Sequence, residues 1–266
     1  MRKSLQTLAL ALVATAPSLA MAVNDPWSAP FSIQIGAFDA KATTTARLDG
    51  TGGRLGTSVS FEGDLGLDDT KALPNFDFTW RFNRYHALEG TIVSLHRDGT
   101  RTLTGQINWG DNTYPVNTSV TSKFDSDIFR MAYRYSFVNS PDGEFAVLLG
   151  AHWTKVEAGI ANAAGSLNKS ESVNYPLPTI GMRGSARVGD NWRLAGFGQL
   201  LKIKIGDYDG ELYNFGGGVE WAFTPAMFMG LGYDYYKFKV VSTKDVTRAE
   251  FDYKFDGPKL YFGWSF

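Results

Sequence analysis

The sequence predicts an all-β chain that forms one transmembrane antiparallel up-and-down β-barrel of about ten strands, within a range of roughly 8 to 12. Three observations predict this fold class. Apolar and polar residues alternate with a period of two, the polar connections alternate in length, and no apolar stretch after the amino-terminal region is long enough for a membrane helix. We expect two parts, a signal peptide over residues 1–22 and a barrel domain over residues 23–266.

The first 22 residues have the features of a cleavable export signal. Two basic residues follow Met1, a mostly apolar stretch covers residues 5–16, and Ala20 and Ala22 form a small-residue cleavage site. We predict that the mature chain begins at Val23. The alternative, an uncleaved membrane helix, requires about 20 continuous apolar residues, and polar residues and a proline interrupt this segment.

The composition excludes several classes of site. The chain has 26 basic and 27 acidic residues, and removal of residues 1–22 takes away two basic residues, which leaves 24 against 27 and a net charge of −3. This balance gives no indication of a nucleic-acid partner. The absence of cysteine excludes disulfides, thiolate zinc sites and cysteine nucleophiles, and it is compatible with an exported protein that needs no covalent cross-links.

Period-two alternation marks the expected strands. The clearest example places Phe76, Phe78, Trp80 and Phe82 on one face, with polar residues between them. Similar alternation covers residues 129–137, 145–153, 180–188, 213–223 and 227–235, and less regular segments lie near residues 29–48, 86–100 and 192–205. In the first of the less regular segments we expect a bulge between Ala37 and Phe38 that switches the parity of the strand.

The connections between these segments alternate in length. Short links fall at residues 83–85, 138–143, 189–191 and 224–225, and longer polar links fall at residues 49–71, 97–118, 161–174 and 242–249, with a brief one at residues 206–210. Outer-membrane barrels have short periplasmic turns and longer extracellular loops. We therefore expect both chain ends in the periplasm, as an even number of strands requires.

Aromatic residues gather in two sets that we interpret as interfacial girdles. The first set adjoins the short turns and consists of Trp80, Phe82, Tyr85, Tyr135, Phe137, Trp192, Trp221, Phe223, Trp264 and Phe266. The second set would lie near the extracellular surface and consists of Tyr235, Tyr236, Phe238, Phe251, Tyr253 and Phe255. The alternative interpretation is that aromatic residues merely favour strands.

The chain ends on an aromatic residue, with apolar residues at every second position before it. These positions are Leu260, Phe262, Trp264 and Phe266. The pattern resembles the C-terminal signature of bacterial outer-membrane β-barrel proteins. The resemblance implies a location in the outer membrane of a Gram-negative bacterium, with the lipid bilayer, lipopolysaccharide and the barrel-assembly machinery as partners. Residues 63–69 and 132–137 are similar to segments of a widespread group of small outer-membrane barrels, which implies no activity.

The polar faces of the expected strands predict a charged barrel interior. We assign to it Asp77, Arg81, Arg130, Arg134, Arg183, Arg187, Arg193, Glu220, Asp234 and Lys259. The interior of a barrel of about eight strands is filled by side chains, whereas a barrel of about 16 strands contains an open channel. A barrel of ten strands should therefore have at most a constricted pore. The set contains seven basic and three acidic residues, and a weak preference for anions is the resulting hypothesis.

Two kinds of hydrolase were considered for the extracellular rim. A protease similar to the omptins needs paired acids and an Asp–His pair, and the sequence supplies the acids near residues 125–127 and 207–209 without a histidine at matching spacing. An acyl hydrolase needs a serine activated by histidine. Ser94 and His96 share a strand face about 6.6 Å apart. Direct contact is not expected, and we predict a protein without enzymatic activity.

The remaining polar motifs give no cofactor or metal site. His86 falls beside an expected periplasmic turn, and His152 faces the lumen if Trp153 faces lipid. The acids near residues 64–69 offer at best weak calcium binding, and a solvated loop is the better interpretation. The glycines at 216–218 lie within a strand with no helix after it, so they are not a phosphate-binding loop.

The leading hypothesis is a non-enzymatic barrel that supports long extracellular loops for binding or surface integrity and has a mostly filled lumen. A channel for small solutes or lipophilic compounds is the second class, and it requires a continuous lumen. A rim hydrolase is the third class, and it requires a histidine beside a serine or an aspartate in space. A soluble periplasmic β-sandwich stays open as an architecture.

Overall fold

The computed structural model describes residues 25–162, 168–244 and 247–266. The predicted cleavage site at Ala20 and Ala22 lies outside the described residues. No helix in the described part of the chain has the length and hydropathy of a membrane span. Every regular element is a strand apart from one short 3-10 turn, η1 (Thr51–Gly53).

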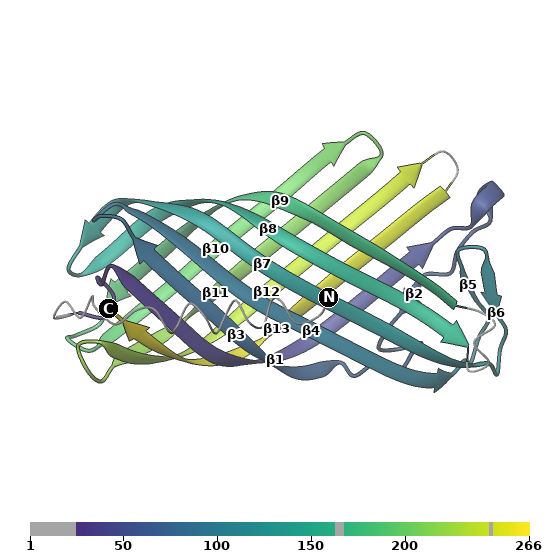
Figure 1. The fold of residues 1–266 in the computed structure, drawn as a ribbon, viewed down its shortest axis with the longest axis horizontal. Coiled ribbons are helices and arrows are strands. Elements are labelled where there is room, and N and C mark those ends of the chain that lie inside the picture. Colours follow the sequence, from purple (N-terminus) through teal and green to yellow (C-terminus); the bar gives the residue numbers. More distant parts are fainter. Residues whose placement is uncertain (1–24, 163–167, 245–246) are drawn as a thin grey trace.

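Ten long antiparallel strands form a closed ring (Figure 1). They are β1 (Phe31–Leu48), β3 (Thr70–Arg81), β4 (His86–Thr102), β7 (Ser119–Ser140), β8 (Gly143–Asn162), β9 (Asn168–Arg187), β10 (Trp192–Ile205), β11 (Tyr208–Ala222), β12 (Met227–Lys244) and β13 (Thr247–Ser265). Each strand pairs with the next, and β13 pairs with β1. The prediction of about ten strands is confirmed, and the alternative of a β-sandwich is wrong because the sheet closes on itself.

Three further strands lie in the first two long connections. The two-residue strand β2 (Val59–Ser60) pairs with β1, while β5 (Ile107–Trp109) and β6 (Asn112–Tyr114) form a separate hairpin. The start of β1 and the end of β13 meet at the opposite end of the barrel, beside the short turns, where Phe31 and Phe266 exchange backbone hydrogen bonds. The short connections therefore lie at one end of the barrel, which we call the periplasmic end, and the long connections lie at the other, which we call the extracellular end.

The outward face of the periplasmic half is apolar. Side chains such as Trp80, Tyr135, Leu149, Met182 and Phe262 are between 43% and 57% exposed on the outer wall. Exposure of so large an apolar surface to water would be unfavourable, whereas contact with lipid is favourable. The predicted alternation, with apolar residues outward and polar residues inward, holds in this half.

The polarity of the two faces reverses in the extracellular half. On β12, Leu231 and Tyr233 are outward in the lower part, whereas higher up Lys237 is outward and Tyr236 and Phe238 are buried inside. The other strands show the same reversal where they leave the apolar band. The barrel therefore consists of a membrane half with a polar interior and an outer half with an apolar interior.

The second expected aromatic girdle is therefore wrong for five of its six members, and only Tyr235 lies on the outward face of its strand. Tyr236, Phe238, Tyr253 and Phe255 are at most 5% exposed and belong to the core inside the barrel, and Phe251 packs against that core. Period-two alternation separates the two faces of a strand but does not say which face meets lipid. Where the outside is aqueous, the aromatic face turns inward.

The expected bulge between Ala37 and Phe38 is also wrong. The pairing of β1 with β3 keeps one register from Phe31 opposite Trp80 to Lys41 opposite Thr70. Phe38 points inward and is 2% exposed because the interior is apolar at its level, so no change of parity is needed. The register shift that the structure does contain lies in β7, between Ser136 and Val138.

The long connections contain more strand than expected. The link expected at residues 161–174 is mostly strand, because β8 ends at Asn162 and β9 begins at Asn168, and residues 242–249 are likewise mostly strand. A membrane-spanning strand needs only about 9–11 residues, whereas β7 has 22 and β8 has 20. The extra length extends the barrel beyond the membrane, where charged side chains face outward.

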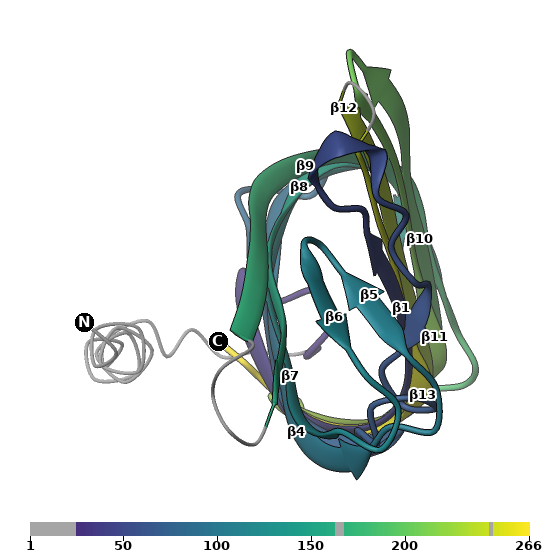
Figure 2. The ribbon, with the colours of Figure 1, turned by 90° about the vertical axis from the view of Figure 1, so that its right-hand side faces the viewer.

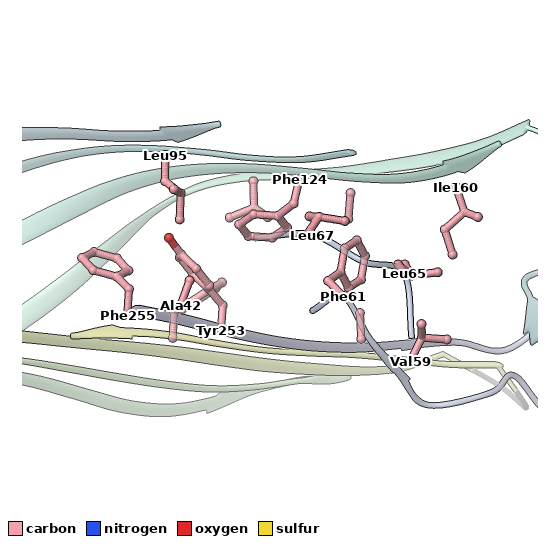
Figure 3. Packing of buried hydrophobic residues seen from close by; sticks show 14 of the residues in the cluster. Ala42, Val59, Phe61, Leu65, Leu67, Leu95, Phe124, Ile160, Tyr253 and Phe255 are labelled. Atoms are coloured by element: carbon pink, nitrogen blue, oxygen red, sulfur yellow. The ribbon is translucent and has the colours of Figure 1, made fainter. Parts of the chain in front are cut away.

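The first long loop folds into the outer half of the barrel instead of lying in solvent. Val59, Phe61, Leu65 and Leu67 are at most 4% exposed. Figure 3 shows Phe61, Leu65 and Leu67 between the wall strands that carry Phe124 and Tyr253. The ring of Phe61 lies 5.9 Å from that of Phe124. We call residues 57–67 the first plug segment.

The β5–β6 hairpin completes the filling. Viewed from the extracellular end, it lies within the outline of the ring (Figure 2). Ile107, Trp109 and Tyr114 are buried, and the Trp109 ring lies 6.3 Å from that of Phe61. The backbone N–H of Thr57 donates to the carbonyl oxygen of Asn108 at 2.8 Å, which joins the hairpin to the first plug segment.

A buried arginine fixes the first loop to the wall. Arg97 of β4 is 2% exposed and donates to Glu62 Oε1 at 2.5 Å, to Thr44 Oγ1 at 2.6 Å and to the carbonyl oxygen of Asp68 at 3.0 Å. Its guanidinium also lies 5.0 Å from the ring centre of Phe124. Because a buried guanidinium needs partners for its charge and its N–H groups, these contacts specify one position for the loop.

Candidate functional site: the charged lumen

All ten charged residues that the sequence assigned to the interior lie on inward positions in the membrane half. Arg134, Arg193, Glu220 and Lys259 are buried, and the others are partly buried. They form two groups, a lower one toward the periplasm and an upper one toward the middle of the barrel.

Arg134 is the centre of the lower group. Its Nη1 lies 2.6 Å from Glu89 Oε1 and its Nε lies 3.4 Å from Glu144 Oε1. Arg81 pairs with Glu144 at 3.3 Å, and Arg183 pairs with Glu89 at 3.7 Å. The two pairs of Arg134 link neighbouring strands, whereas the Arg81–Glu144 pair links β3 to β8 and the Arg183–Glu89 pair links β9 to β4, which are not neighbours in the ring.

A second ion pair lies beside this group on the opposite wall. Arg193 of β10 lies 2.5 Å from Glu220 Oε2 of β11, and the Tyr261 hydroxyl of β13 donates to Glu220 Oε1 at 2.8 Å. Both carboxylate oxygens of Glu220 are therefore satisfied. A buried charge of this kind is stable only with such partners.

The upper group surrounds Lys259. Its Nζ lies 2.8 Å from Asp77 Oδ2 and 3.7 Å from Asp234 Oδ2. The Thr91 hydroxyl donates to Asp77 Oδ1 at 2.6 Å, and Arg130 donates to Asn214 Oδ1 at 2.7 Å. The group contains two acids and two bases, so its charges balance locally.

Sequence reasoning missed three acidic members of the interior. Glu89 and Glu144 accept from the lower arginines, and Asp25 forms an ion pair with Arg187. They raise the number of acids from three to six against seven bases, so the expected positive excess nearly disappears. Glu89 stands next to a glycine in an irregular segment, and Glu144 adjoins a turn, so alternation alone did not assign them.

The N-terminal segment occupies the periplasmic end of the barrel. The Trp27 ring lies between two guanidinium groups, 4.9 Å from that of Arg187 and 5.1 Å from that of Arg193. The Trp27 carbonyl oxygen accepts from Arg81 Nη2 at 2.9 Å, and Ser265 donates to the carbonyl oxygen of Pro26 at 2.7 Å. Cation–π and hydrogen-bond contacts thus seat the tryptophan in the mouth of the barrel.

A polar cavity of about 100 Å³ lies in the lumen of the membrane half. Among the residues that line it are Asp77, Glu89, Arg130, Arg183, Glu220 and Lys259. It is large enough for several water molecules. The apolar core of the outer half lies above this cavity, and Trp27 with the lower arginines lies beneath it.

His152 lies at the upper edge of the polar region. It is fully buried, its Nε2 lies 3.3 Å from Gln199 Oε1, and its ring stacks on Tyr236 at 6.1 Å. Trp153 is 41% exposed on the outer wall, so the condition set by the sequence is met and His152 faces inward. His86 lies on the outer wall, where it contacts Tyr133 and Tyr135.

The candidate hydrolase residues lie on the outer surface. His96 Nε2 of β4 is 3.2 Å from Asp127 Oδ1 of β7, with the two side chains 55% and 46% exposed. Ser94 stands directly opposite Asp127 on the same face. No hydrogen bond between Ser94 and His96 is recorded in the described part of the chain. Sequence spacing missed the His96–Asp127 pair because it forms across strands.

No group of three or more potential metal ligands occurs among the described residues. In the first loop, Asp64 accepts a hydrogen bond from the backbone N–H of Ser60 at 2.8 Å, which ties its carboxylate to its own turn. Asp207 and Asp209 lie where β10 turns into β11. Among the described residues, no histidine is found in contact with either aspartate.

The C-terminal residues occupy the end of β13. Leu260, Phe262 and Trp264 are 49%, 54% and 51% exposed on the outer wall. Phe266 pairs through its backbone with Phe31, which closes the ring at the periplasmic end. Recognition of these side chains by assembly machinery stays a prediction.

No protein-family model matches the sequence. No curated protein matches it either. Among solved structures, the fold is similar to that of the outer membrane protease OmpT from Escherichia coli, with 10% identity, coverage of 89% of this chain and 96% of that chain, and a TM-score of 0.59. The translocator domain of the autotransporter NalP from Neisseria meningitidis has 10% identity, coverage of 98% and 95%, and a TM-score of 0.46. A FadL homologue from Pseudomonas aeruginosa has 9% identity, coverage of 90% and 93%, and a TM-score of 0.37.

The first of these similarities defines the class of fold. The chain has the fold of bacterial outer-membrane β-barrel proteins. Together with the apolar outer band, this fold is that of a protein of the bacterial outer membrane.

Proposed function

We propose that the protein is a closed, non-enzymatic barrel of the outer membrane that presents a fixed extracellular surface for binding or for the integrity of the cell surface. In this function the lumen conducts no solutes. The barrel acts as a rigid support, and the loops packed at its outer end are the part that partners contact.

The packing of the outer half is the observation that carries this proposal. Phe61, Trp109, Tyr114 and Phe124 come from two loops and the wall, and all four are at most 2% exposed. A pore of this width would need a lining that water can wet, whereas these side chains exclude water. The buried contacts of Arg97 add a polar anchor that a mobile gate would have to break.

The alternative function, a channel, requires a continuous lumen through which solutes pass. Osmotic swelling of proteoliposomes in sugars and amino acids distinguishes the two. We expect no swelling above that of empty liposomes. Swelling that depends on solute size would favour the channel and would overturn the proposal.

We also propose that the barrel is inserted by the barrel-assembly machinery and contacts lipopolysaccharide. The outward position of Leu260, Phe262 and Trp264 supports the first partner, because an external face of β13 is available to be read. Charged side chains directly above the apolar band support the second. Replacement of Phe266 by Ser should reduce the amount of heat-modifiable barrel in the outer membrane, and an unchanged amount would contradict this role.

One observation favours a second candidate function, that of an acyl hydrolase acting at the membrane surface. The His96–Asp127 pair supplies an oriented imidazole, and Ser94 lies on the same face, just above the lipid-facing Ile92 and Phe129. Hydrolysis of a long-chain nitrophenyl ester in detergent tests it. Activity that is lost in both Ser94→Ala and His96→Ala would establish the hydrolase and overturn a non-enzymatic function.

A further inference from the structure

The wall between β9 and β10 is paired over only part of its length. Pairs run from Arg187 opposite Arg193 to Ile180 opposite Leu200, and no further pair between these strands is recorded for the described residues. Both strands continue beyond that point and stay paired on their other sides, β9 with β8 and β10 with β11. In Figure 1 the β10–β11 hairpin diverges from β9 in the outer half. We call this opening the β9–β10 seam.

Two prolines explain where the pairing stops. The N–H of Arg187 donates toward β8, and that of Val188 donates toward β10. Because these directions alternate along an antiparallel strand, even-numbered residues of β9 face β10. Pro176 and Pro178 are even-numbered and have no N–H. The ladder therefore ends at Ile180, the last residue that can donate to β10 before the two prolines.

A second seam obeys the same rule but is filled. Pairing of β3 with β4 ends at Asn75 opposite Val93, and Pro74 follows with its nitrogen toward β4 by the same alternation. There the chain covers its own edge, because Lys71 donates to the carbonyl oxygen of His96 at 2.6 Å and the first loop packs beside β4. In the β9–β10 seam, no such covering contact is recorded for the described residues.

The β9–β10 seam opens at the outer limit of the apolar band. Ile180, Met182 and Leu200 are 58%, 57% and 46% exposed on the outer wall. The next two outward residues of β10 are Lys202 and Lys204. Unpaired N–H groups are costly in hydrocarbon, and the two prolines of β9 remove them from the part of the edge that adjoins lipid.

The lining of the seam is amphiphilic. Its outer side consists of exposed residues of both strands, Pro176 and Pro178 of β9 and Lys202 and Lys204 of β10, and its inner side consists of the half-buried Leu177 and Leu201, which pack against the core. The last pair is Ile180 opposite Leu200, so the continued register puts Pro178 at the level of Lys202 and Pro176 at the level of Lys204. The Lys202 side chain is 71% exposed and lies 2.9 Å from Glu211. No ion pair of Lys204 is recorded among the described residues.

We propose that the β9–β10 seam binds lipopolysaccharide from the outer leaflet, with an acyl chain against the outward Ile180 and Leu200 where the seam begins and a phosphate on Lys202 and Lys204. The exposed Leu200 and the two ammonium groups follow one another along β10 in the order in which an acyl chain and a phosphate lie across a leaflet. This inference rests on the outer-membrane location of the proposed function but not on the closed lumen, so the swelling assay and the binding assay below fail independently.

Titration of the delipidated full-length protein in detergent with lipopolysaccharide, followed by native mass spectrometry, measures the binding. The double variant Lys202→Gln/Lys204→Gln should bind roughly tenfold more weakly or worse. The matched control is Lys237→Gln/Lys239→Gln, which removes the first two outward lysines above the apolar band on β12. Because β12 is paired on both sides, the affinity of this control variant for lipopolysaccharide should change less than about twofold. Equal losses in both double variants would overturn the proposal.

A second variant tests the contribution of the open seam without removing charge. Pro176→Ala/Pro178→Ala restores two N–H groups and should extend the ladder, which slower hydrogen exchange of the new amides would report. The affinity of this variant for lipopolysaccharide should fall as the seam closes. Unchanged affinity in a variant whose seam has closed would overturn the proposal, and so would equally tight binding of phosphatidylglycerol by the unmodified protein. Heat-modifiable migration of each variant confirms that the barrel has folded.

Discussion

The hydroxyl of Tyr114 donates a hydrogen bond to the carbonyl oxygen of Ile160 at 2.9 Å, at a position where both residues are at most 1% exposed. This contact joins the β5–β6 hairpin to the wall strand β8. It is a polar link within an otherwise apolar core, so it selects one position of the hairpin among those that hydrophobic packing would allow.

Tyr114→Phe should lower the free energy of unfolding by about 1–2 kcal/mol, because the carbonyl oxygen of Ile160 loses a buried donor. Urea unfolding of the refolded protein in detergent or liposomes measures the change. Tyr208→Phe is the matched control, since Tyr208 is 53% exposed, and it should have no measurable effect. Equal effects of the two substitutions would argue against an ordered hairpin inside the barrel.

Phe124→Ala should lower the free energy of unfolding by about 3–5 kcal/mol, since the ring lies in the middle of the core inside the barrel. It contacts Phe61 at 5.9 Å and Tyr253 at 4.9 Å. Phe137→Ala on the same strand is the control, because Phe137 is 48% exposed on the outer wall. If Phe137→Ala costs as much as Phe124→Ala in the same unfolding titration, the outer half has no packed core.

Arg134→Met should lower the free energy of unfolding by about 3–5 kcal/mol, because it leaves Glu89 and Glu144 buried without their main cation. Addition of Glu89→Gln and Glu144→Gln to this variant should restore part of the loss, since the uncompensated charges are removed. Arg248→Gln breaks an exposed pair with Glu250 and should cost less than about 1 kcal/mol. No recovery in the triple variant would mean that the lower group is not held by charge.

Stability of the first loop should depend on pH through Asp49. Burial alone would raise the pKa of this carboxyl, but Arg47 and the N–H of Gly56 outweigh that effect and lower it from its ordinary value of 3.8. A lowered pKa means that the stabilisation is present above pH 3.8 and is lost as the pH falls through the lower folded value. The protection of the Gly56 amide against hydrogen exchange, relative to its intrinsic exchange rate at each pH, should therefore fall in acid more steeply than in Asp49→Asn, in which this protection should be low already at pH values near neutrality. Identical pH profiles would contradict this assignment.

Trp27→Ala should open the periplasmic end of the central cavity. The chain contains no cysteine, so a single cysteine in place of the cavity-lining Ala195 reports access to a small charged thiol reagent. Labelling should be slow with Trp27 in place and clearly faster in Trp27→Ala. Trp192→Ala, which removes a tryptophan 48% exposed on the outer wall, is the control and should leave the rate unchanged. Equal rates in all three backgrounds would show that Trp27 does not close the mouth.

Much of the membrane half was predictable from the sequence because lipid imposes a simple rule on it. On β3, Phe76, Phe78 and Trp80 alternate with Asp77, Thr79 and Arg81, and the structure has the apolar residues outside and the polar ones inside. The charged interior followed from the same pattern. The inward positions of Glu89 and Glu144 were not predicted, because glycines and turn residues beside them interrupt the alternation.

The outer half could not be predicted in the same way, since its strands alternate as regularly but with the two faces exchanged. Tyr253 and Phe255 read as lipid-facing residues and are core residues. Nothing in the local pattern marks the height at which lipid gives way to water. The charged outward residues, such as Lys237 and Lys254, are the signal that fixes this height once the register is known.

The folding of loops into the barrel was also beyond a local analysis. Val59, Phe61, Leu65 and Leu67 are separated by polar and glycine residues, and they read as a solvated loop. They are buried because the wall around them offers an apolar interior that must be filled. By contrast, the ends of the two seams were predictable in principle, since Pro74 and Pro178 cannot donate to the neighbouring strand.

The central claim is that the lumen is closed by the loops packed in its outer half, and single-channel current in a planar lipid bilayer tests it most directly. The unmodified protein should insert without steady current steps, and a variant in which residues 57–67 are replaced by a short Gly-Ser linker and Trp27 by Ala should show small, resolved steps. Regular current steps from the unmodified protein, equal to those of the variant, would contradict the account.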